Sequence, residues 1–155
     1  RYRQLLELGS SIGIVPQVEM WGGHPAIGTV EKAMYIALRA DHPNACFLGD
    51  VYHTYKGGCG FEGFRLLSAK ALQVFHFNDY PAEPSQAMIK DEHRVFPGDG
   101  VAPLEDLIRS FADNGAYPVL SLELFNREYW ERPAEETART GLAKMKSVVA
   151  RSLRA

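Results

Sequence analysis

The chain has 155 residues, enough for one domain with a hydrophobic core of its own. Its 46% hydrophobic and 23% charged residues are typical of globular proteins, and a formal net charge of -2 provides no basic surface for nucleic acid. No apolar run is long enough to span a bilayer, so we expect no membrane partner. Cys46 and Cys59 are too few for a disulfide framework, which favours a location in the reducing cytoplasm.

The spacing of apolar residues predicts strands alternating with amphipathic helices. In the first half we expect a helix over 1–8 that Gly9 and Gly13 end, a strand over 12–20, a helix over 29–39 capped by Thr29, and a strand ending at Asp50. A loop over 52–60, a helix over 61–72, a strand over 73–78, a helix beginning at Pro103, a strand over 117–125 and a helix over 133–153 follow. The polar segment 79–101 between them has the length of a functional loop.

Four β/α repeats predict a parallel sheet with right-handed crossovers. They amount to half of a (β/α)8 TIM barrel, whose usual length is about 250 residues. Because the sequence begins at Arg1 within a helix pattern, we expect residues 1–155 to be the C-terminal half of a single barrel domain. A doubly wound open sheet is the alternative, but no Gly-rich phosphate turn follows the first strand.

Three carboxylates and one imidazole fall at the ends of the four predicted strands: Glu19, Asp50, His76 and Glu123. In a TIM barrel this end of the strands carries the active site. A carboxylate at the end of a mostly buried strand destabilises the fold by roughly several kcal/mol unless it is paired with a cation or bound to a metal. Oxygen ligands with one nitrogen suit Mn²⁺, Mg²⁺, Co²⁺ or Zn²⁺, so the pattern predicts one divalent metal without selecting among these four.

The order Glu19, Asp50-x-x-His53, His76 and Glu123 resembles that of the xylose isomerase-like TIM barrels, the sugar phosphate isomerase/epimerase family. The segment DEHRVFPGDG over 91–100, with SLELF over 121–125 and EYW over 128–130, looks most like inosose (2-keto-myo-inositol) isomerases. The sequence departs from the family in length, because the first four strands of the barrel are not in it.

This resemblance implies that one divalent metal is held by Glu19, Asp50, His76 and Glu123. It also implies that Glu19 and Glu123 lie on opposite sides of the substrate as an acid/base pair. The metal would chelate a ketone oxygen and the neighbouring hydroxyl oxygen, and so stabilise the enediolate formed when the α-proton leaves.

Four further residues are candidates for contact with the substrate. His53 would hydrogen-bond a substrate oxygen or orient a ligand, and Arg94 would clamp an oxygen beside the metal; both are also expected to be catalytic. Trp21 shares a strand face with Glu19 and would form a pocket wall, and Asn78 shares a face with His76. The alternatives are a solvated loop histidine, a solvated loop arginine and a core tryptophan.

We therefore expect a metal-dependent isomerase or epimerase of a keto-sugar or keto-inositol, a small-molecule substrate that the enzyme enolises. A homo-oligomer is compatible with this interpretation. The alternatives are a dehydratase of the same superfamily, acting on inosose or 3-dehydroshikimate, and a non-catalytic sugar-binding half-barrel. An endonuclease of the abasic-site type is disfavoured by the acidic charge balance.

Overall fold

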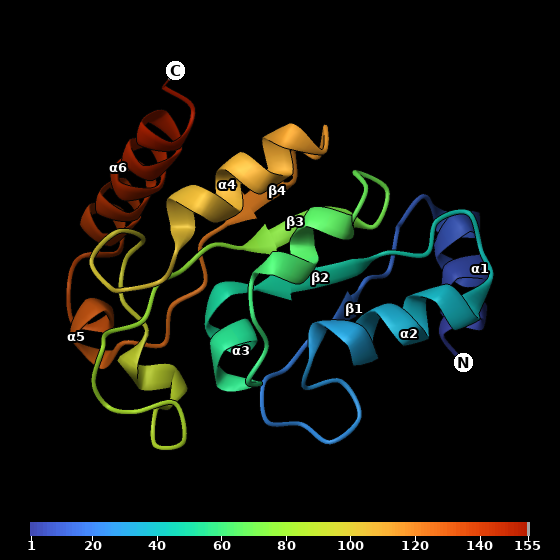
Figure 1. Ribbon diagram of the computed structural model, residues 1–155, viewed down its shortest axis with the longest axis horizontal. Coiled ribbons are helices and arrows are strands. Elements are labelled where there is room, and N and C mark those ends of the chain that lie inside the picture. The colour runs from blue at the N-terminus through green and yellow to red at the C-terminus, as the bar shows by residue number, and fades with distance from the viewer. Residues whose placement is uncertain (155) are drawn as a thin grey trace.

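The computed structural model describes residues 1–154 and contains a sheet of four parallel strands in the order β1-β2-β3-β4 (Figure 1). Its strands are β1 (Val18–Glu19), β2 (Phe47–Asp50), β3 (Leu72–His76) and β4 (Val119–Ser121). Each strand pairs in parallel with the next one along the chain. The predicted α/β architecture is confirmed, since sequential parallel strands joined by helical segments form the wall of a barrel.

Helical segments connect the strands and flank the sheet: α1 (Tyr2–Ile12), α2 (Val30–Ala40), α3 (Val51–Lys56), η1 (Glu62–Leu66), η2 (Asp91–His93), α4 (Leu104–Asp113), α5 (Arg127–Trp130) and α6 (Ala134–Ser152). In Figure 1, α1 and α2 lie beside the β1 end of the sheet, and α4 and α6 lie together at the β4 end. Within residues 1–154, none of the helices combines the length and the apolar character needed to cross a membrane.

Three helix starts agree closely with the sequence. The hydroxyl of Thr29 accepts a hydrogen bond from the Lys32 amide at 3.4 Å and so caps α2. Pro103 and Pro133 directly precede α4 and α6, where their missing N–H groups are not needed by the helix.

The first helix is longer than predicted, and the first strand is shorter. Gly9 does not end α1, which continues to Ile12 and stops at Gly13, whose φ of +75° suits glycine. A side chain at position 9 would place its Cβ 2.4 Å from the Ile14 carbonyl oxygen. This glycine therefore allows the returning chain to pass close to the helix, and it is not a stop signal.

The second β/α connection also differs from the prediction. The expected loop over 52–60 begins with α3, because the Asp50 carboxylate accepts a hydrogen bond from the His53 amide at 2.8 Å and caps the helix. The expected helix over 61–72 is reduced to the single 3₁₀ segment η1. Gly63 within that segment disfavours a longer helix.

An aromatic cluster forms the centre of the core between the sheet and η1 and α4. Phe64 of η1 lies edge-on to Phe75 of β3 at 5.3 Å between ring centroids and to Phe111 of α4 at 6.1 Å. Phe64 also stacks on Phe47 of β2 at 6.3 Å. Although the predicted helix is reduced to η1, the ring of Phe64 still packs against β2 and β3, as a residue of a full crossover helix would.

The hydroxyl of Tyr2 ties α1 to the starts of two strands. It lies 2.9 Å from the Pro16 carbonyl oxygen and 2.8 Å from that of Cys46, and it accepts a hydrogen bond from the Cys46 amide at 3.2 Å. Burial is the main reason why the pKa of Tyr2 is raised to about 12.

We expect Tyr2→Phe to lower the free energy of unfolding by about 1–3 kcal/mol, since the Cys46 groups lose their partner. Tyr35→Phe is the control, because Tyr35 is 64% exposed on α2. The folded-state pKa of Tyr2 lies above the value of about 10 in unfolded chains, so its contribution is present below pH 10 and is lost as the pH rises through 12. Urea unfolding of both variants from pH 7 to 12 measures this, and equal stability of Tyr2→Phe and wild type at pH 7 would contradict it.

Candidate active site

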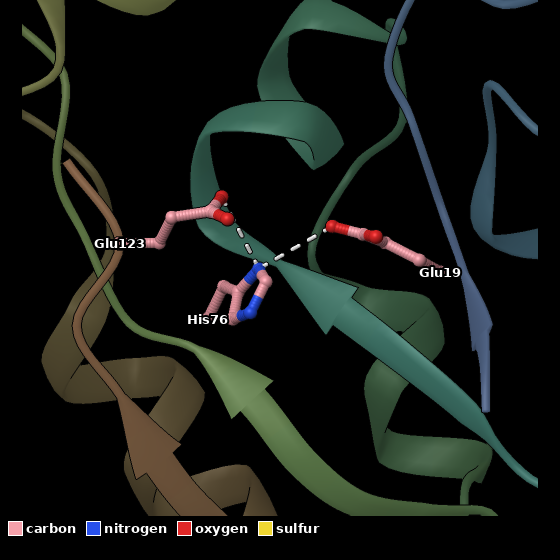
Figure 2. Close-up of side chains that lie close together, drawn as sticks. All are labelled: Glu19, His76 and Glu123. Carbon is pink, nitrogen blue, oxygen red and sulfur yellow. Dashed lines mark ion pairs between the residues drawn. The ribbon is translucent and has the colours of Figure 1, made fainter. Parts of the chain in front are cut away.

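The carboxyl ends of the four strands bring the predicted metal ligands together. Glu19 is the last residue of β1, Asp50 and His76 end β2 and β3 directly opposite each other, and Glu123 lies just beyond β4. Figure 2 shows the side chains of Glu19 and Glu123 pointing toward His76 from opposite sides. Parallel strands end at the same edge of a sheet, so residues distant in sequence meet here.

The Nδ1 atom of His76 is the centre of this group. It lies 3.3 Å from Glu123 Oε2, 3.4 Å from Asp50 Oδ2 and 3.7 Å from Glu19 Oε1. These three contacts are ion pairs when the ring is protonated. The Nδ1 atom is buried and has no well-aligned hydrogen-bond partner among residues 1–154. Burial lowers the pKa of His76, but contacts with Asp50 and Glu123 outweigh it and raise that pKa to about 9.

The two glutamates experience different surroundings. Burial is the largest influence on Glu19 and raises the pKa of its carboxyl group. The contact with His76 is the largest influence on Glu123 and lowers the pKa of that group to about 2. The same edge of the sheet therefore holds one carboxylate that is paired with positive charge and one that is less well compensated.

The donor atoms fit a divalent cation. One ligand atom each from Glu19, His76 and Glu123 lie within 4.8 Å of one another. Zinc bonds to oxygen and nitrogen are about 2.1 Å long, so ligands on one cation lie at most about 4.2 Å apart. A small contraction would place all three on one ion, and the unpartnered nitrogen of His76 already faces the shared centre.

Asp50, the fourth predicted ligand, lies beside this set of three and is engaged by protein groups. Its Oδ1 atom accepts the hydrogen bond from the His53 amide that caps α3. Its Oδ2 atom accepts hydrogen bonds at 3.2 Å from Asn78 Nδ2 and from Arg94 Nη1. Asp50 is completely buried, and its binding to a metal stays a prediction.

Arg94 is buried inside the site, which contradicts the alternative of a solvated loop arginine. Its Nη1 atom donates hydrogen bonds to Glu123 Oε2 at 2.8 Å and to Asp50 at 3.2 Å. The guanidinium also lies over two aromatic rings, with its Cζ 4.5 Å from the centroid of Tyr52 and 5.0 Å from that of Phe125. The charge pairs and the two aromatic rings together restrict the position of this cation.

His53 is also buried, with 4% of its surface exposed, and lies in α3, so the alternative of a solvated loop histidine is wrong. Its Nε2 atom is 2.9 Å from Arg94 Nη2. A guanidinium can only donate, so Nε2 accepts and the ring proton is on Nδ1. Burial lowers the pKa of His53, in keeping with this neutral form. Its Nδ1 has no hydrogen-bond partner in the described part of the chain.

The other two predicted substrate contacts have different settings. Trp21 is 57% exposed, which excludes a core position, and its ring meets that of His53 edge-on at 6.3 Å between centroids. Asn78 is completely buried, and its Oδ1 accepts a hydrogen bond from the Tyr52 amide at 2.9 Å. Its Nδ2 donates to Asp50 and to the Glu123 carbonyl oxygen, so this amide links strand ends within the protein.

Three residues that contact Arg94 were not predicted: Asp91, Tyr52 and Phe125. Asp91 accepts a hydrogen bond from Arg94 Nη2 across the turn η2, and the Asp-x-x-Arg spacing is a signal that could have found it. The two rings carry no such signal, because their contact with Arg94 depends on how three separate segments meet.

Known proteins resemble this chain in sequence and in fold. The chain is 29% identical over 150 residues to the inosose isomerase of Bacillus licheniformis, covering 96% of this chain and 53% of the relative. It is 25% identical over 126 residues to the 3-dehydroshikimate dehydratase of Pseudomonas putida, covering 81% of this chain and 20% of the relative. A crystal structure of the IOLI protein with a binding zinc atom superimposes with a TM-score of 0.88 at 26% identity, over 99% of this chain and 55% of that one.

The chain thus spans about half the length of the inosose isomerase that it matches. Residues 1–148 match the family described as Xylose isomerase-like TIM barrel. The parallel strands, the acidic and imidazole groups at their carboxyl ends and this match agree, and the chain belongs to the xylose isomerase-like TIM barrel family.

Proposed function

We propose that this chain carries the metal-binding part of an isomerase or epimerase that acts on a keto-sugar or keto-inositol. The observation that carries the proposal is the meeting of Glu19, His76 and Glu123 at the carboxyl edge of the parallel sheet. Similarity to an inosose isomerase supports a polyol ketone as the substrate class. The zinc atom in the structure of the IOLI protein supports a divalent cation.

In this proposal Glu19, His76 and Glu123 hold the cation, and Asp50 completes the set from the buried side. When bound, a divalent cation would polarise the carbonyl oxygen of the substrate and make the neighbouring C–H bond more acidic. The mixture of carboxylate oxygens and one imidazole suits Zn²⁺, Mn²⁺, Co²⁺ and Mg²⁺, and zinc is the first to test because of the IOLI protein.

Glu19 and Glu123 would transfer the proton. Their carboxylates reach the centre of the site from opposite sides, so a substrate between them faces one on each side (Figure 2). One carboxylate takes the proton from the carbon next to the carbonyl, and the other returns a proton to carbon or to oxygen. Return to the opposite face of the same carbon gives an epimer, and return at the neighbouring position gives an isomer.

Three further residues would orient the substrate. The Nδ1–H group of His53 lacks a partner among the described residues, so it can donate to a substrate oxygen. Arg94 would bind a second oxygen beside Glu123, and its contacts with two rings limit its movement. Trp21 offers an exposed aromatic face beside His53 as a wall for the apolar side of a sugar ring.

The similarity to a 3-dehydroshikimate dehydratase favours a dehydratase as the second candidate. Both reactions begin with removal of a proton next to a carbonyl group. They differ in the second step, because a dehydratase then expels a neighbouring hydroxyl group as water. Mass spectrometry of the product distinguishes them, since only dehydration lowers its mass.

We also propose that residues 1–155 are the C-terminal half of one barrel domain, whose other β/α units cover the two edges of this sheet. Strands β1 and β4 are the outer strands among the described residues. Large apolar side chains are exposed beside both edges, on α1, β4 and α6: Leu5, Leu8, Ile12, Val119 and Leu142. The 53% coverage of the inosose isomerase supports the same proposal.

Zinc binding tests the metal site independently of turnover. Isothermal titration calorimetry of the metal-free protein should show one zinc site, and His76→Ala should weaken it by about 100-fold or more, above the 10–100-fold typical of residues that only support a ligand. His42→Ala is the matched control, because His42 lies in the turn before β2. Equal zinc affinity in His76→Ala and wild type would remove His76 from the site.

Proton exchange tests the chemistry. With zinc bound, the protein with the other β/α units of the barrel present should introduce solvent deuterium next to the carbonyl of 2-keto-myo-inositol or of a member of a ketose panel, detected by NMR. Glu123→Gln should abolish the exchange with an unchanged circular dichroism spectrum, because it removes a base and keeps the shape. Glu136→Gln, at an exposed position in α6, should exchange like wild type. Zinc binding without exchange for any ketone would instead support a sugar-binding half-barrel.

Self-association tests the half-barrel proposal. Sedimentation velocity of the 155-residue chain alone should show concentration-dependent association, since an uncovered strand edge binds other chains. Val119→Lys should reduce it, because Val119 is 67% exposed on the edge strand β4. Leu66→Lys is the control, as Leu66 is 88% exposed but lies in η1. A monomer at every concentration would argue that these edges need no cover.

A further inference from the structure

Asp79 is a buried acid that none of the roles above uses. It lies just beyond β3, and its carboxylate accepts four main-chain hydrogen bonds from the segment 80–102. Oδ1 accepts from the amides of Tyr80 at 2.8 Å and Ala102 at 3.0 Å, and Oδ2 from those of Gly98 at 2.9 Å and Gly100 at 3.0 Å. One side chain thus satisfies amides from both ends of a long connection.

The main chain of Asp79 is attached to the same segment. Its amide donates to the Val95 carbonyl oxygen at 3.1 Å, and the Val95 amide donates to the Asp79 carbonyl oxygen at 3.0 Å. This antiparallel bridge fixes the main chain of Val95, which directly follows Arg94. On the other side of Arg94, the turn η2 supplies Asp91 as a partner for its guanidinium.

The segment is built closely around the Asp79 carboxylate. At Gly100 an added Cβ would lie 2.4 Å from Asp79 Oδ1 and 2.2 Å from the Tyr80 carbonyl oxygen. Gly98 has a φ of +86°, a conformation that favours glycine. Both glycines therefore allow backbone amides to reach the carboxylate, which explains the Pro-Gly-Asp-Gly sequence over 97–100 without a phosphate ligand.

We propose that Asp79 is a positioning residue that determines where the segment 91–102 holds the guanidinium of Arg94 against Asp50 and Glu123. This inference rests on the proposed function, in which Arg94 binds a substrate oxygen. Loss of the carboxylate leaves four amides without their acceptor, and the segment then moves to let water reach them. Arg94 moves with it, because the bridge to Asp79 holds Val95, the next residue along the chain, although Asn126 Nδ2 also donates to the Arg94 carbonyl oxygen at 3.2 Å.

The decisive variant is Asp79→Asn, which keeps the shape of the side chain and one acceptor oxygen. Its NH₂ group would face two main-chain amides, which are donors themselves and would lose their acceptor. Asp79→Ala is its stronger partner. Asp99→Asn is the matched control, since Asp99 lies in the same segment and pairs with Lys144 at the surface. The first readout is the ¹⁵N NMR resonance of Arg94 Nε–H, an atom that is buried and unpartnered in the described chain. Its absence in Arg94→Lys assigns it.

We expect Asp79→Asn to shift this resonance and to speed its hydrogen exchange by about tenfold or more, with no change in Asp99→Asn. Zinc affinity should change less than KM, because Glu19, Asp50 and His76 are fixed by the ends of β1, β2 and β3. With 2-keto-myo-inositol as the probe, KM should rise more than kcat falls. Adding Asp79→Asn to Arg94→Lys should have little further effect on KM, since both act through one group.

A lower melting temperature with an unmoved Arg94 resonance and an unchanged KM would overturn the inference and leave Asp79 a stabilising residue only. Independent, additive effects of Asp79→Asn and Arg94→Lys on KM would overturn it as well. If the resonance responds as expected while the wild-type protein, with the other β/α units of the barrel present, turns over no ketone, the positioning by Asp79 stands and the proposed function fails. The NMR and kinetic measurements thus separate the two proposals.

Discussion

The site depends on balancing a high density of negative charge at the carboxyl edge of the sheet. Glu19, Asp50 and Glu123 meet there, and Asp50 has no access to water. Buried carboxylates require positive charge or several donors nearby. Arg94 supplies a permanent charge, and the raised pKa of His76, about 9, shows that the carboxylates also favour a proton on that ring. A divalent cation between the same groups would meet the same requirement.

The fold satisfies this requirement with few elements. The strand ends supply the ligands, and the cap of α3 turns Asp50 into both a helix start and a member of the site. Asn78 joins β2, β3 and the residues beyond β4 through its amide, so these segments are linked by hydrogen bonds beside the ligands. The rigidity of the site thus comes from buried polar groups whose hydrogen bonds are made within the protein.

Much of this arrangement could be predicted from sequence, because it depends on strand periodicity. Apolar runs that end in Glu19, Asp50 and His76 locate the strand ends, and parallel pairing then brings these ends together. The role of Asp50 as a helix cap could have been predicted, because an Asp directly before a short helix is a typical cap. The glycines at positions 57, 58 and 60 instead suggested a loop. Gly9 was misleading because a glycine that permits close packing looks like one that ends a helix.

The setting of Arg94 could not be predicted in the same way. Its motif indicated a loop, and loop arginines are usually solvated. Its burial results from tertiary contacts: the ring of Tyr52 comes from α3, that of Phe125 from the segment after β4, and the backbone bridge to Val95 from Asp79, just beyond β3. No local pattern in the sequence encodes the meeting of these three segments.

The start of α3 at Asp50 fixes the spacing of two residues of the candidate site. Asp50 and His53 are joined by a single turn of helix, whose rise is about 1.5 Å per residue, so about 4.5 Å along the axis separates their backbones. Side-chain substitution elsewhere cannot alter that spacing. In the proposed function, substrates of different size would then have to be accommodated by residues outside this turn, such as Trp21 and Phe125, while the spacing of the groups that meet adjacent oxygens stays constant.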